Sequence, residues 1–445
     1  MSIRILDSFK IGAKVGFFGL GQSNSALLRC LPLDSCSVTL RSDSAIDRSA
    51  IPGGIKIDRI FEGINACRDI NEDIIVFSPS VRRDRAEFLR AQKTGTIFTS
   101  DLEIFIEENH KPMFAVTGSD GKSTTAALIE HLLNEGGTRA FSVGNMGEPM
   151  VSRLSDAADF YVAELSSFML TYAIPKTKRA CLTNITPNHL DWHIDFEEYK
   201  KTKISLIKNC EEFVISDDFT DIPGGFGVIS TEKGFEDLKK QYQAEVYMTV
   251  ENGYICRNGE RLIPICDIQR RESHNIKNLM MATAMTDGYV GKNEIINVAK
   301  SFSGLPHRCE CFFSDNGIDY FNSSIDTSPA RTAATLSSLG RRAVVILGGK
   351  SKGLDYREMI PALKSYAAAV VIVGENSHEL YSALSGEIEC HIAEDFKSAI
   401  RLGATLARDA GALILSPASA SYDSFKNYEE RGNEFKKQVL KTRIL

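Results

Sequence analysis

The sequence lacks the features that mark membrane proteins, disulfide-stabilised proteins and nucleic-acid-binding proteins. No apolar run reaches the ~18–20 residues that a membrane-spanning helix requires. The net charge of −6 provides no basic excess that would attract nucleic acid. The 10 cysteines form no Cys-x-x-Cys pair, which argues against a metal or disulfide framework and favours reduced thiols. We therefore expect a cytoplasmic protein with no nucleic-acid partner, no membrane association and no obligate protein partner.

Strands and helices alternate along the 445 residues, which predicts α/β domains with largely parallel sheets. The apolar stretch Val15–Leu20 is short for the core of a signal peptide and ends in a Gly-x-Gly turn, so we interpret it as the first strand. We expect domains over residues 1–98, 99–302 and 303–445, with Rossmann-like sheets in the first and the last. Short alternating runs over residues 217–270 predict a small antiparallel sheet in the middle domain.

The clearest candidate motif is the run Val-Thr-Gly-Ser-Asp-Gly-Lys-Ser-Thr-Thr over residues 116–125. An apolar strand precedes it and apolar residues at helical spacing follow it, which is the setting of a phosphate-binding loop. Gly118 and Gly121 would let backbone N–H groups face an anion at the N-terminus of the helix. The alternative is a plain glycine-rich turn, because Val116 stands where the usual motif has a glycine.

Side chains suited to phosphate and Mg²⁺ occur in this run and after it. Lys122 would reach the terminal phosphates, and Ser123 or Thr124 would offer a hydroxyl to Mg²⁺. Glu164 ends an apolar strand and resembles the acidic residue that holds Mg²⁺ opposite a phosphate loop. Taken alone, a strand-end glutamate is more often a cap or an ion-pair partner. Downstream of a phosphate loop, metal binding is the favoured interpretation.

A second set of candidate ligands follows the next apolar strand. His189 and Asp191 would suit a second Mg²⁺ or Mn²⁺ ion, and a hydrogen-bonded histidine in a polar loop is the alternative. We expect His193 to lie on the surface. Lys203 belongs to a lysine-rich helix whose charges are mostly solvated. A lysine drawn between metal ions would place a cation beside cations, which is unfavourable.

The run Ser273-His-Asn-Ile-Lys-Asn278 begins a helix with Ser273 as the candidate N-cap. Asn275 and Asn278 lie three residues apart, so their amides share one face of the helix. Such amides can donate to and accept from an adenine edge, whereas capping would explain only one of them.

Six motifs in this order resemble the Mur ligases of peptidoglycan synthesis, and the resemblance runs essentially from end to end. The motifs are Thr117-Gly-x-x-Gly-Lys-Ser-Thr124, Glu164-Leu-Ser-Ser-Phe168, Asn184-x-Thr-x-x-His189-Leu-Asp191, His274-Asn-x-x-Asn278, Leu305-Pro-His-Arg308 and Ser416-Pro-Ala-x-Ala-Ser-x-Asp423-x-Phe-Lys-Asn427. The last block resembles the branch that joins D-glutamate to UDP-N-acetylmuramoyl-L-alanine. The resemblance implies a UDP-substrate-binding N-terminal domain, a central P-loop ATPase domain and a C-terminal amino-acid-binding domain.

The resemblance also implies which residues bind each ligand. ATP would contact Gly118, Ser119, Asp120, Gly121, Lys122, Ser123, Thr124, Asn275, Asn278 and Arg308. Two Mg²⁺ ions, with Mn²⁺ as the alternative, would be held by Ser123, Glu164, His189 and Lys203, the last as a carbamate that turns a cation into an anion. The UDP substrate would contact Gln22, Ser23, Arg41 and Asn145. D-Glutamate would contact Thr327, Lys352, Ser421, Tyr422 and Tyr428. The expected catalytic residues are Lys122, His189 and Lys203.

One block departs from the family pattern. Where these ligases have Asn-Asp-Ser-Lys-Ala-Thr, the chain has Asn-Ser-Ser-Ile-Asp-Thr over residues 322–327. Ser323 replaces the aspartate expected near the ATP ribose, and Asp326 would take its place only from a shifted turn. Ile325 replaces the lysine expected near the amino acid, so Lys352 would carry more of the contact to D-glutamate.

The implied reaction activates a carboxylate. The alanyl carboxylate would attack the γ-phosphate of ATP, and the amine of D-glutamate would displace phosphate from the acyl phosphate. Domain closure would exclude the water that hydrolyses such an intermediate. Two alternatives stay open. One is a ligase of the same superfamily with another amino acid or acceptor, such as a folylpolyglutamate synthase-like enzyme. The other is a non-catalytic nucleotide-binding relative, which only the replacements at 323 and 325 support.

Overall fold

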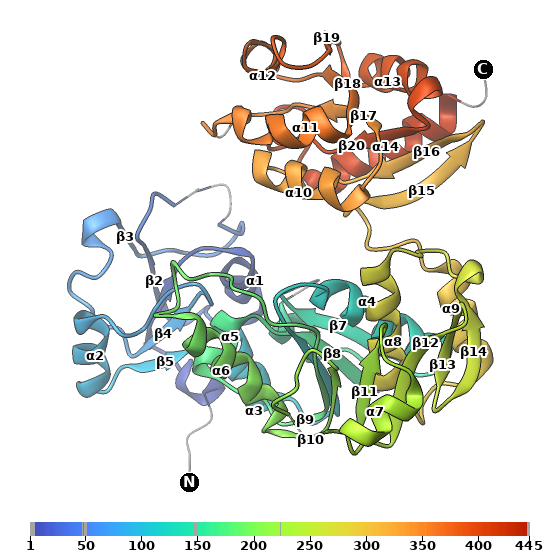
Figure 1. Ribbon diagram of the computed structural model, residues 1–445. Coiled ribbons are helices and arrows are strands. Elements are labelled where there is room, and N and C mark those ends of the chain that lie inside the picture. The colour runs from blue at the N-terminus through green and yellow to red at the C-terminus, as the bar shows by residue number, and fades with distance from the viewer. Residues whose placement is uncertain are drawn as a thin grey trace. The chain divides into compact units, whose positions relative to one another are not determined.

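The computed structural model describes residues 5–46, 48, 51–145, 149–222, 224–351 and 353–442, without the side chains of Gln22 and Thr442. The chain forms two compact units, Met1–Ser301 and Phe302–Leu445. Three sheets follow one another along the chain, two in the first unit and one in the second (Figure 1). Within the described residues, no helix is long and apolar enough to cross a membrane.

The first sheet has five parallel strands in the order β3-β2-β1-β4-β5. Its strands are β1 (Lys14–Phe18), β2 (Ser37–Ser42), β3 (Arg59–Glu62), β4 (Ile74–Phe77) and β5 (Ile97–Thr99), and the helices here are α1 (Gln22–Cys30), α2 (Ala86–Lys93) and α3 (Asp101–Glu108). The expected first strand is therefore confirmed as β1. All residues of β4 are buried, which is typical of a parallel strand covered on both faces.

The second sheet has nine strands in the order β14-β13-β12-β11-β10-β9-β6-β8-β7. They are β6 (Met113–Thr117), β7 (Ala140–Gly144), β8 (Phe160–Glu164), β9 (Thr177–Leu182), β10 (Cys210–Ser216), β11 (Gly227–Ser230), β12 (Val246–Glu251), β13 (Tyr254–Arg257) and β14 (Glu260–Pro264). The expected antiparallel region is confirmed, but it extends the same sheet. β11 pairs in parallel with β10 and β12, and only β12, β13 and β14 pair antiparallel.

Helices cover both faces of the second sheet. They are α4 (Lys122–Glu135), α5 (Ser167–Tyr172), α6 (Phe196–Ile207), α7 (Phe235–Gln241), α8 (Ser273–Met285) and α9 (Lys292–Ser301). Along β6, Met113 and Ala115 share a core cluster with Leu206 of α6. Phe114, between them, packs its ring against Tyr289, which follows α8. Because side chains alternate along a strand, α6 and α8 lie on opposite faces of the sheet.

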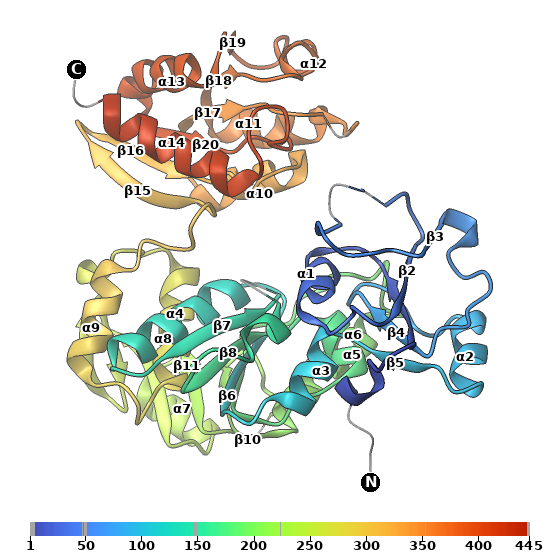
Figure 2. The ribbon, with the colours of Figure 1, turned by 180° about the vertical axis from the view of Figure 1, so that it is seen from behind.

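Hydrogen bonds join the first two sheets within the first unit. Trp192 Nε1 donates to Ser80 O at 2.7 Å, and Arg82 donates to Trp192 O at 2.7 Å. The helices α1 and α3 also pack against the 3-10 helix η4 (Met150–Arg153), which connects β7 to β8. Figure 2 labels α1, α3, β7 and β8. The expected boundary near residue 98 falls within β5, a strand of the first sheet, and it divides one compact unit, so it stays a prediction. The expected boundary near residue 302 lies beside the division between Ser301 and Phe302, and it also stays a prediction.

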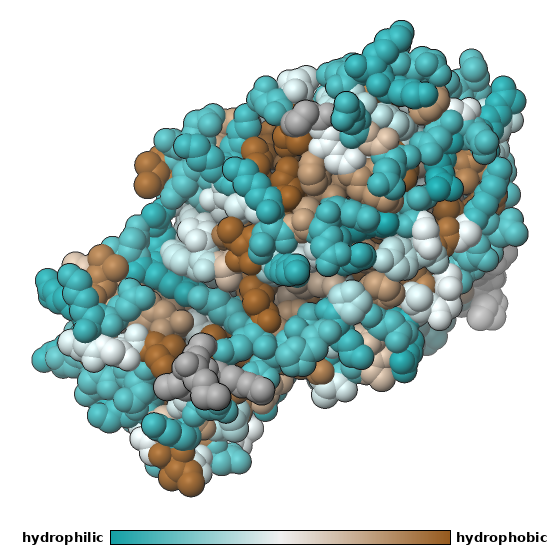
Figure 3. Space-filling model, turned by 90° about the horizontal axis from the view of Figure 1, so that it is seen from below, coloured by the Kyte–Doolittle hydropathy of each residue, from teal (hydrophilic) through white to brown (hydrophobic). Residues whose placement is uncertain are grey.

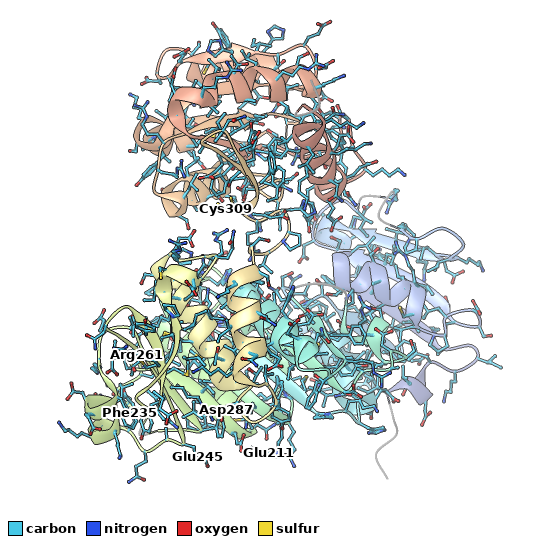
Figure 4. All side chains as sticks on the ribbon, turned by 90° about the vertical axis from the view of Figure 1, so that its right-hand side faces the viewer. Glu211, Phe235, Glu245, Arg261, Asp287 and Cys309 are labelled. Atoms are coloured by element: carbon cyan, nitrogen blue, oxygen red, sulfur yellow. The ribbon has the colours of Figure 1, made fainter. Side chains whose placement is uncertain are left out.

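The second unit holds a six-stranded sheet in the order β15-β16-β20-β17-β18-β19, in which only β15 and β16 pair antiparallel. Its elements are β15 (Glu310–Asp315), β16 (Ile318–Asn322), α10 (Pro329–Leu339), β17 (Ala343–Leu347), α11 (Ile360–Tyr366), β18 (Ala367–Ile372), α12 (Ser377–Leu384), β19 (Cys390–Ile392), α13 (Phe396–Ala410), β20 (Ala412–Leu415) and α14 (Tyr428–Thr442). Cys309 directly precedes β15 (Figure 4), and all ten cysteines are free thiols. The expected α/β fold class is confirmed.

Candidate active site

Four of the segments that the sequence singles out end at one edge of the second sheet. β6 lies between β8 and β9, with Val116 opposite Glu164. β7 lies on the other side of β8, with Gly144 opposite Glu164. Because these strands are parallel, the phosphate loop, Glu164, Asn145 and the loop after β9 all meet at the carboxyl edge of the sheet.

The phosphate loop requires glycine at two positions. Gly118 has a φ of +149° and Gly121 a φ of +78°, values that side-chain-bearing residues rarely adopt. A Cβ on Gly118 would overlap Thr183 Oγ1, and a Cβ on Gly121 would overlap Asn278 Oδ1. The two glycines therefore let the loop pass directly against the loop after β9 and against α8.

The loop after β9 holds the phosphate loop in place. The N–H of Ser119 donates to Asn184 O at 2.9 Å, and the N–H of Asp120 donates to Asn184 Oδ1 at 2.8 Å. Thr183 Oγ1 donates to Asp120 O at 2.6 Å. The hydroxyls of Ser119 and Tyr199 lie 2.8 Å apart and share a hydrogen bond. Such anchoring reduces the ordering cost when an anion binds.

The start of α4 completes the phosphate site. Lys122 is the first residue of α4, and its ammonium donates to Ser119 O at 2.6 Å, so it lies over the loop. Ser123 is buried and Thr124 is half-buried in the same turn. The helix N-terminus adds its partial positive charge to that of the lysine. The structure therefore brings together the loop residues expected to bind the ATP phosphates.

Glu164 carries an unpartnered carboxylate oxygen. The residue is 1% exposed at the end of β8, and Asn145 Nδ2 donates to its Oε1 at 2.9 Å. Its Oε2 is buried and has no hydrogen-bond partner among the described residues. A buried carboxylate oxygen without a partner is costly unless a donor or a cation binds it. This oxygen therefore fits a divalent ion.

Lys203 reaches the same loop from α6. It is 2% exposed, and its Nζ donates to Gly118 O at 2.7 Å. Burial and then the ammonium of Lys122 lower the pKa of Lys203 to about 7, against the opposing effects of Glu164 and Asp120. A large fraction of Lys203 is therefore a neutral amine near pH 7, which is the form that reacts with CO₂ to give a carbamate.

His189 lies in the loop after β9 and has a positive φ of 54°. Its ring packs against Phe168, with 4.8 Å between the ring centroids. Burial lowers the pKa of His189, and the ammonium groups of Lys203 and Lys122 lower it further, although Asp191 raises it. The imidazole is therefore neutral at neutral pH, which is the form that binds metal ions.

The expectation that His193 lies on the surface is wrong. His193 is 3% exposed, and its ring packs against those of Trp192 and Tyr199. Its Nδ1 lies 3.4 Å from the carboxylate of Glu198. The N–H of His193 donates to His189 O at 3.0 Å, so the chain turns back and directs this ring inward. A polar loop has no periodicity from which the sequence could predict that turn.

The donors at this edge fit a hard divalent cation. They are the unpartnered oxygen of Glu164, the hydroxyl of Ser123 and the neutral imidazole of His189. The two oxygen donors are of the kind that Mg²⁺ and Mn²⁺ prefer. No group of three or more His, Cys, Asp and Glu residues that could hold a metal ion occurs in the described part of the chain. A metal site here would therefore depend on Ser123 and Lys203 as well.

The candidate adenine-binding residues lie in the first turns of α8. This helix begins at Ser273 with Glu272 as its N-cap, so the expected cap at Ser273 is wrong by one residue. Asn278 Oδ1 accepts a hydrogen bond of 3.3 Å from Thr125 Oγ1 of α4, which brings it to the phosphate loop. Asn275 Nδ2 instead donates to Glu272 Oε2 at 3.0 Å.

The residues expected to bind the UDP substrate on the first sheet do not share one environment. Ser23 lies in the first turn of α1, and the side chain of Gln22 lies outside the described residues. Arg41 is fully buried, and its guanidinium donates to Glu72 at 2.9 Å and to three carbonyl oxygens of residues 66–69. A uridine contact by Arg41 would require these bonds to break.

The residues expected to bind D-glutamate lie in the second unit. Thr327 follows β16 and Ser421 follows β20, and these strands are parallel neighbours, so both residues lie near the carboxyl edge of the third sheet. Tyr422 is 68% exposed, and Tyr428 is the first residue of α14. Lys352 lies outside the described residues.

The departure from the family pattern has a structural consequence. Asp326 is 4% exposed, and its carboxylate accepts a hydrogen bond of 2.7 Å from Ser416 Oγ. Its N–H donates to Ser323 O at 2.9 Å, so a turn directs the carboxylate inward. The carboxylate of Asp326 is therefore engaged by a hydrogen bond within the second unit. Arg308, expected to meet ATP, is exposed.

Sequence reasoning missed two residues that support these sites. The ring of Tyr199 lies 4.8 Å from Lys203 Nζ, and its spacing of four residues from Lys203 is the signal that would have placed both on one helix face. Arg431 is 2% exposed and donates to Ser324 O at 2.9 Å and to Ser419 O at 3.1 Å. Burial lowers the pKa of Arg431 to about 10. No sequence pattern distinguishes this buried arginine from a solvated one.

Comparison with known proteins agrees with this geometry. The Mur ligase middle domain matches residues 116–286, and the domain described as Mur ligase, glutamate ligase domain, matches residues 307–419. A UDP-N-acetylmuramoylalanine–D-glutamate ligase of Clostridium botulinum is 32% identical over 96% of both chains, and one of Ruminiclostridium cellulolyticum is 31% identical over 98% of both. The crystal structure of UDP-N-acetylmuramate–alanine ligase from Thermotoga maritima shares the fold, with a TM-score of 0.58 and 18% identity over 97% of this chain and 100% of that one. The chain therefore belongs to the Mur ligase family.

Proposed function

We propose that the chain is an ATP-dependent ligase that joins D-glutamate to UDP-N-acetylmuramoyl-L-alanine in the cytoplasmic synthesis of peptidoglycan precursors. The observation that carries the proposal is the edge of the second sheet, where the phosphate loop, the unpartnered oxygen of Glu164 and buried Lys203 meet. The choice of amino acid and acceptor is supported by the similarity to two ligases of that name along nearly the whole chain.

The reaction proceeds in two displacements. An oxygen of the alanyl carboxylate attacks the γ-phosphorus of ATP, the bond to the bridging oxygen breaks, and an acyl phosphate and ADP form. The amine of D-glutamate then attacks the acyl carbon and loses a proton, and phosphate leaves with the electrons of the C–O bond. Lys122 and the N–H groups of the phosphate loop stabilise the phosphate oxygens in the first displacement, because negative charge is redistributed over them.

The side chains around the phosphates also suit divalent ions. Two Mg²⁺ ions, or Mn²⁺ in their place, would be held by Ser123, Glu164, His189 and the carbamate of Lys203, and would neutralise phosphate charge. Asn145 orients Glu164 for this purpose through its hydrogen bond to Oε1. Carbamylation of Lys203 removes an ammonium whose pKa burial and Lys122 already lower, and so relieves repulsion between two cations.

Phosphate release tests this proposal directly. The chain is incubated with ATP, Mg²⁺, UDP-N-acetylmuramoyl-L-alanine and a panel of D- and L-amino acids, with Lys122→Ala as the inactive control. We expect release that requires both the UDP substrate and D-glutamate. Hydroxylamine in place of the amino acid should give a hydroxamate, which reports the acyl phosphate. Preference for another amino acid or acceptor would favour a different ligase, and nucleotide binding without any release would favour a non-catalytic relative.

A further inference from the structure

A cavity of about 520 Å³ lies beside α6, outside the residues assigned to ATP, metal ions and substrates. Its apolar lining consists of Ile185, Phe196, Ile204, Ile207, Phe213, Phe219 and Ile222. Hydrophobic side chains also reach the surface in several separate groups on the face that Figure 3 shows, so exposure alone singles out no site. Volume and an apolar lining together are what distinguish small-molecule sites, and this cavity has both.

The charged residues of the cavity lining are two lysines and two aspartates, and a lysine outside the lining already pairs with one of the aspartates. The lining residues are Lys200, Lys208, Asp218 and Asp221. Asp218 is already engaged, because Lys277 Nζ lies 2.6 Å from its carboxylate. Lys200 lies 3.6 Å from Asp221, whose side chain is 85% exposed, so this pair is weak. Lys208 is exposed, and no ion pair joins it to a carboxylate among the described residues. The cavity therefore offers apolar walls with cations at the rim.

The helix that forms one wall also contacts the phosphate loop. Residues Phe196, Lys200 and Ile204 recur every four positions on α6 and face the cavity. The adjoining face of α6 carries Tyr199 and Lys203. Lys203 donates to Gly118 O at 2.7 Å, and the hydroxyl of Tyr199 shares a hydrogen bond with Ser119 Oγ at 2.8 Å. A small rotation of α6 would therefore move both contacts.

A second segment connects the cavity with the phosphate loop. Ile185 lines the cavity, and both of its neighbours in the chain bind Ser119. Asn184 O accepts from the Ser119 N–H at 2.9 Å, and the N–H of Thr186 donates to Ser119 Oγ at 2.9 Å. Two segments, α6 and the loop after β9, thus line the cavity and also hold the phosphate loop. A ligand that displaces either segment would change the hydrogen bonds of the phosphate loop.

We propose that this cavity binds a small organic anion with an apolar body, such as an aromatic carboxylate or sulfonate, and that its occupancy changes the affinity of the phosphate loop for nucleotide. The apolar walls bury the body of the ligand, and Lys200 and Lys208 pair with the anionic group. Coupling between the two sites is reciprocal, because each ligand must change the affinity of the other by the same factor. The coupling rests on the proposed nucleotide site, whereas binding of the anion does not.

The dye 8-anilinonaphthalene-1-sulfonate tests the binding, because it is an apolar anion whose fluorescence rises in apolar sites. It is titrated against the full chain without nucleotide. We expect saturable binding that Lys208→Glu and Ile222→Asp each weaken at least ~10-fold. Lys201→Glu is the matched control, with the same charge change at an exposed position of α6 outside the cavity lining. Lys208 is exposed, so its replacement does not threaten folding. Binding that is insensitive to both cavity variants would overturn the proposal.

A titration with ADP tests the coupling. It also shows whether the dye binds in the nucleotide site or in a distinct site. If the sites are distinct, the shift in dye affinity reaches a plateau as ADP increases, and saturating dye shifts the ADP affinity by the same factor. A shift that grows without limit would mean direct competition and would overturn the assignment to the cavity. Unchanged affinities in both directions would overturn the coupling.

Discussion

Asn145 Nδ2 donates a hydrogen bond of 2.9 Å to Oε1 of Glu164, and the backbone N–H of Asn145 donates to Glu164 O at 3.0 Å. The residue expected to meet the UDP substrate thus orients a residue expected to bind a metal ion. Because Oε1 is engaged, Oε2 is the oxygen left for the ion. We therefore expect substrate binding and metal binding to be linked through this one side chain.

We predict that Asn145→Ala weakens metal binding as well as substrate binding. Loss of an outer hydrogen bond to a metal ligand typically costs ~10–100-fold in metal affinity or activity. The Mg²⁺ concentration for half-maximal phosphate release should therefore rise ~10-fold or more, even when the UDP substrate is saturating. A change confined to the KM for the UDP substrate would show that Asn145 does not act through Glu164.

The side chain of Lys122 should be essential for turnover and dispensable for folding. It is half-buried at the start of α4 and reaches over the loop rather than into the core. We expect Lys122→Ala to lower the rate of phosphate release at least ~100-fold, as removal of one preorganised donor to a transition state does. The melting temperature should stay close to that of the unaltered chain. Lys111→Ala, at an exposed lysine just before β6, is the control, and near-normal turnover of Lys122→Ala would refute the phosphate-loop assignment.

The parts of this fold that the sequence predicted are those in which local pattern decides the structure. Buried parallel strands such as β6 and β17 are short apolar runs, and Gly118 and Gly121 mark a turn that few other residues could form. Strand order is not local. Asn145 and Glu164 meet because β7 pairs with β8. They are 19 positions apart in the chain, and the segment between them carries no sign of that pairing.

The differences between expectation and structure at the site have a common physical cause. Arg41, His193 and Asp326 are polar residues that the fold buries. Arg41 and Asp326 have hydrogen-bond partners distant in the chain, whereas the ring nitrogens of His193 have no hydrogen-bond partner among the described residues and only its Nδ1 lies near a carboxylate. Polar character at a loop or strand end favours an exposed, ligand-facing interpretation from sequence alone. The burial of such residues becomes visible only when the fold is known.

Lys203 should make the stability of the chain depend on pH. Its pKa of about 7 in the folded chain lies below its ordinary value of 10.5, so between these values the unfolded chain binds a proton that the folded chain does not. The free energy of unfolding should therefore rise with pH across this window, by up to ~5 kcal/mol, and the gain should be lost as pH falls towards 7. Denaturant unfolding at pH 7 and pH 9.5 in CO₂-free buffer measures this. Lys203→Met should lose the slope, and an equal slope in both proteins would contradict the buried neutral lysine.

We also predict that Lys203 carries a carbamate when bicarbonate is present. The neutral amine lies beside Gly118 O, at an edge where an anion would meet metal ions rather than another cation. Lys203→Ala should abolish phosphate release, and short carboxylic acids should restore part of it by supplying the missing carboxylate. Labelled bicarbonate and carbon NMR of the unaltered chain would detect the carbamate itself. Full activity of Lys203→Ala would show that Lys203 has only a structural role.

Selectivity for D-glutamate should rest largely on Lys352. Ile325 is half-buried where related ligases have a lysine, and it cannot pair with a carboxylate. A dicarboxylate bound away from water needs charge-assisted donors, each contributing about 1.5–3 kcal/mol. Lys352→Ala should therefore raise the KM for D-glutamate at least ~10-fold, the factor that ~1.4 kcal/mol represents. The KM for ATP should change little, because the phosphate loop lies on the second sheet. Lys350→Ala, two residues away and exposed, should leave both KM values unchanged. If Lys352→Ala weakens ATP instead, or if D-glutamate is not the preferred amine, the amino-acid site lies elsewhere.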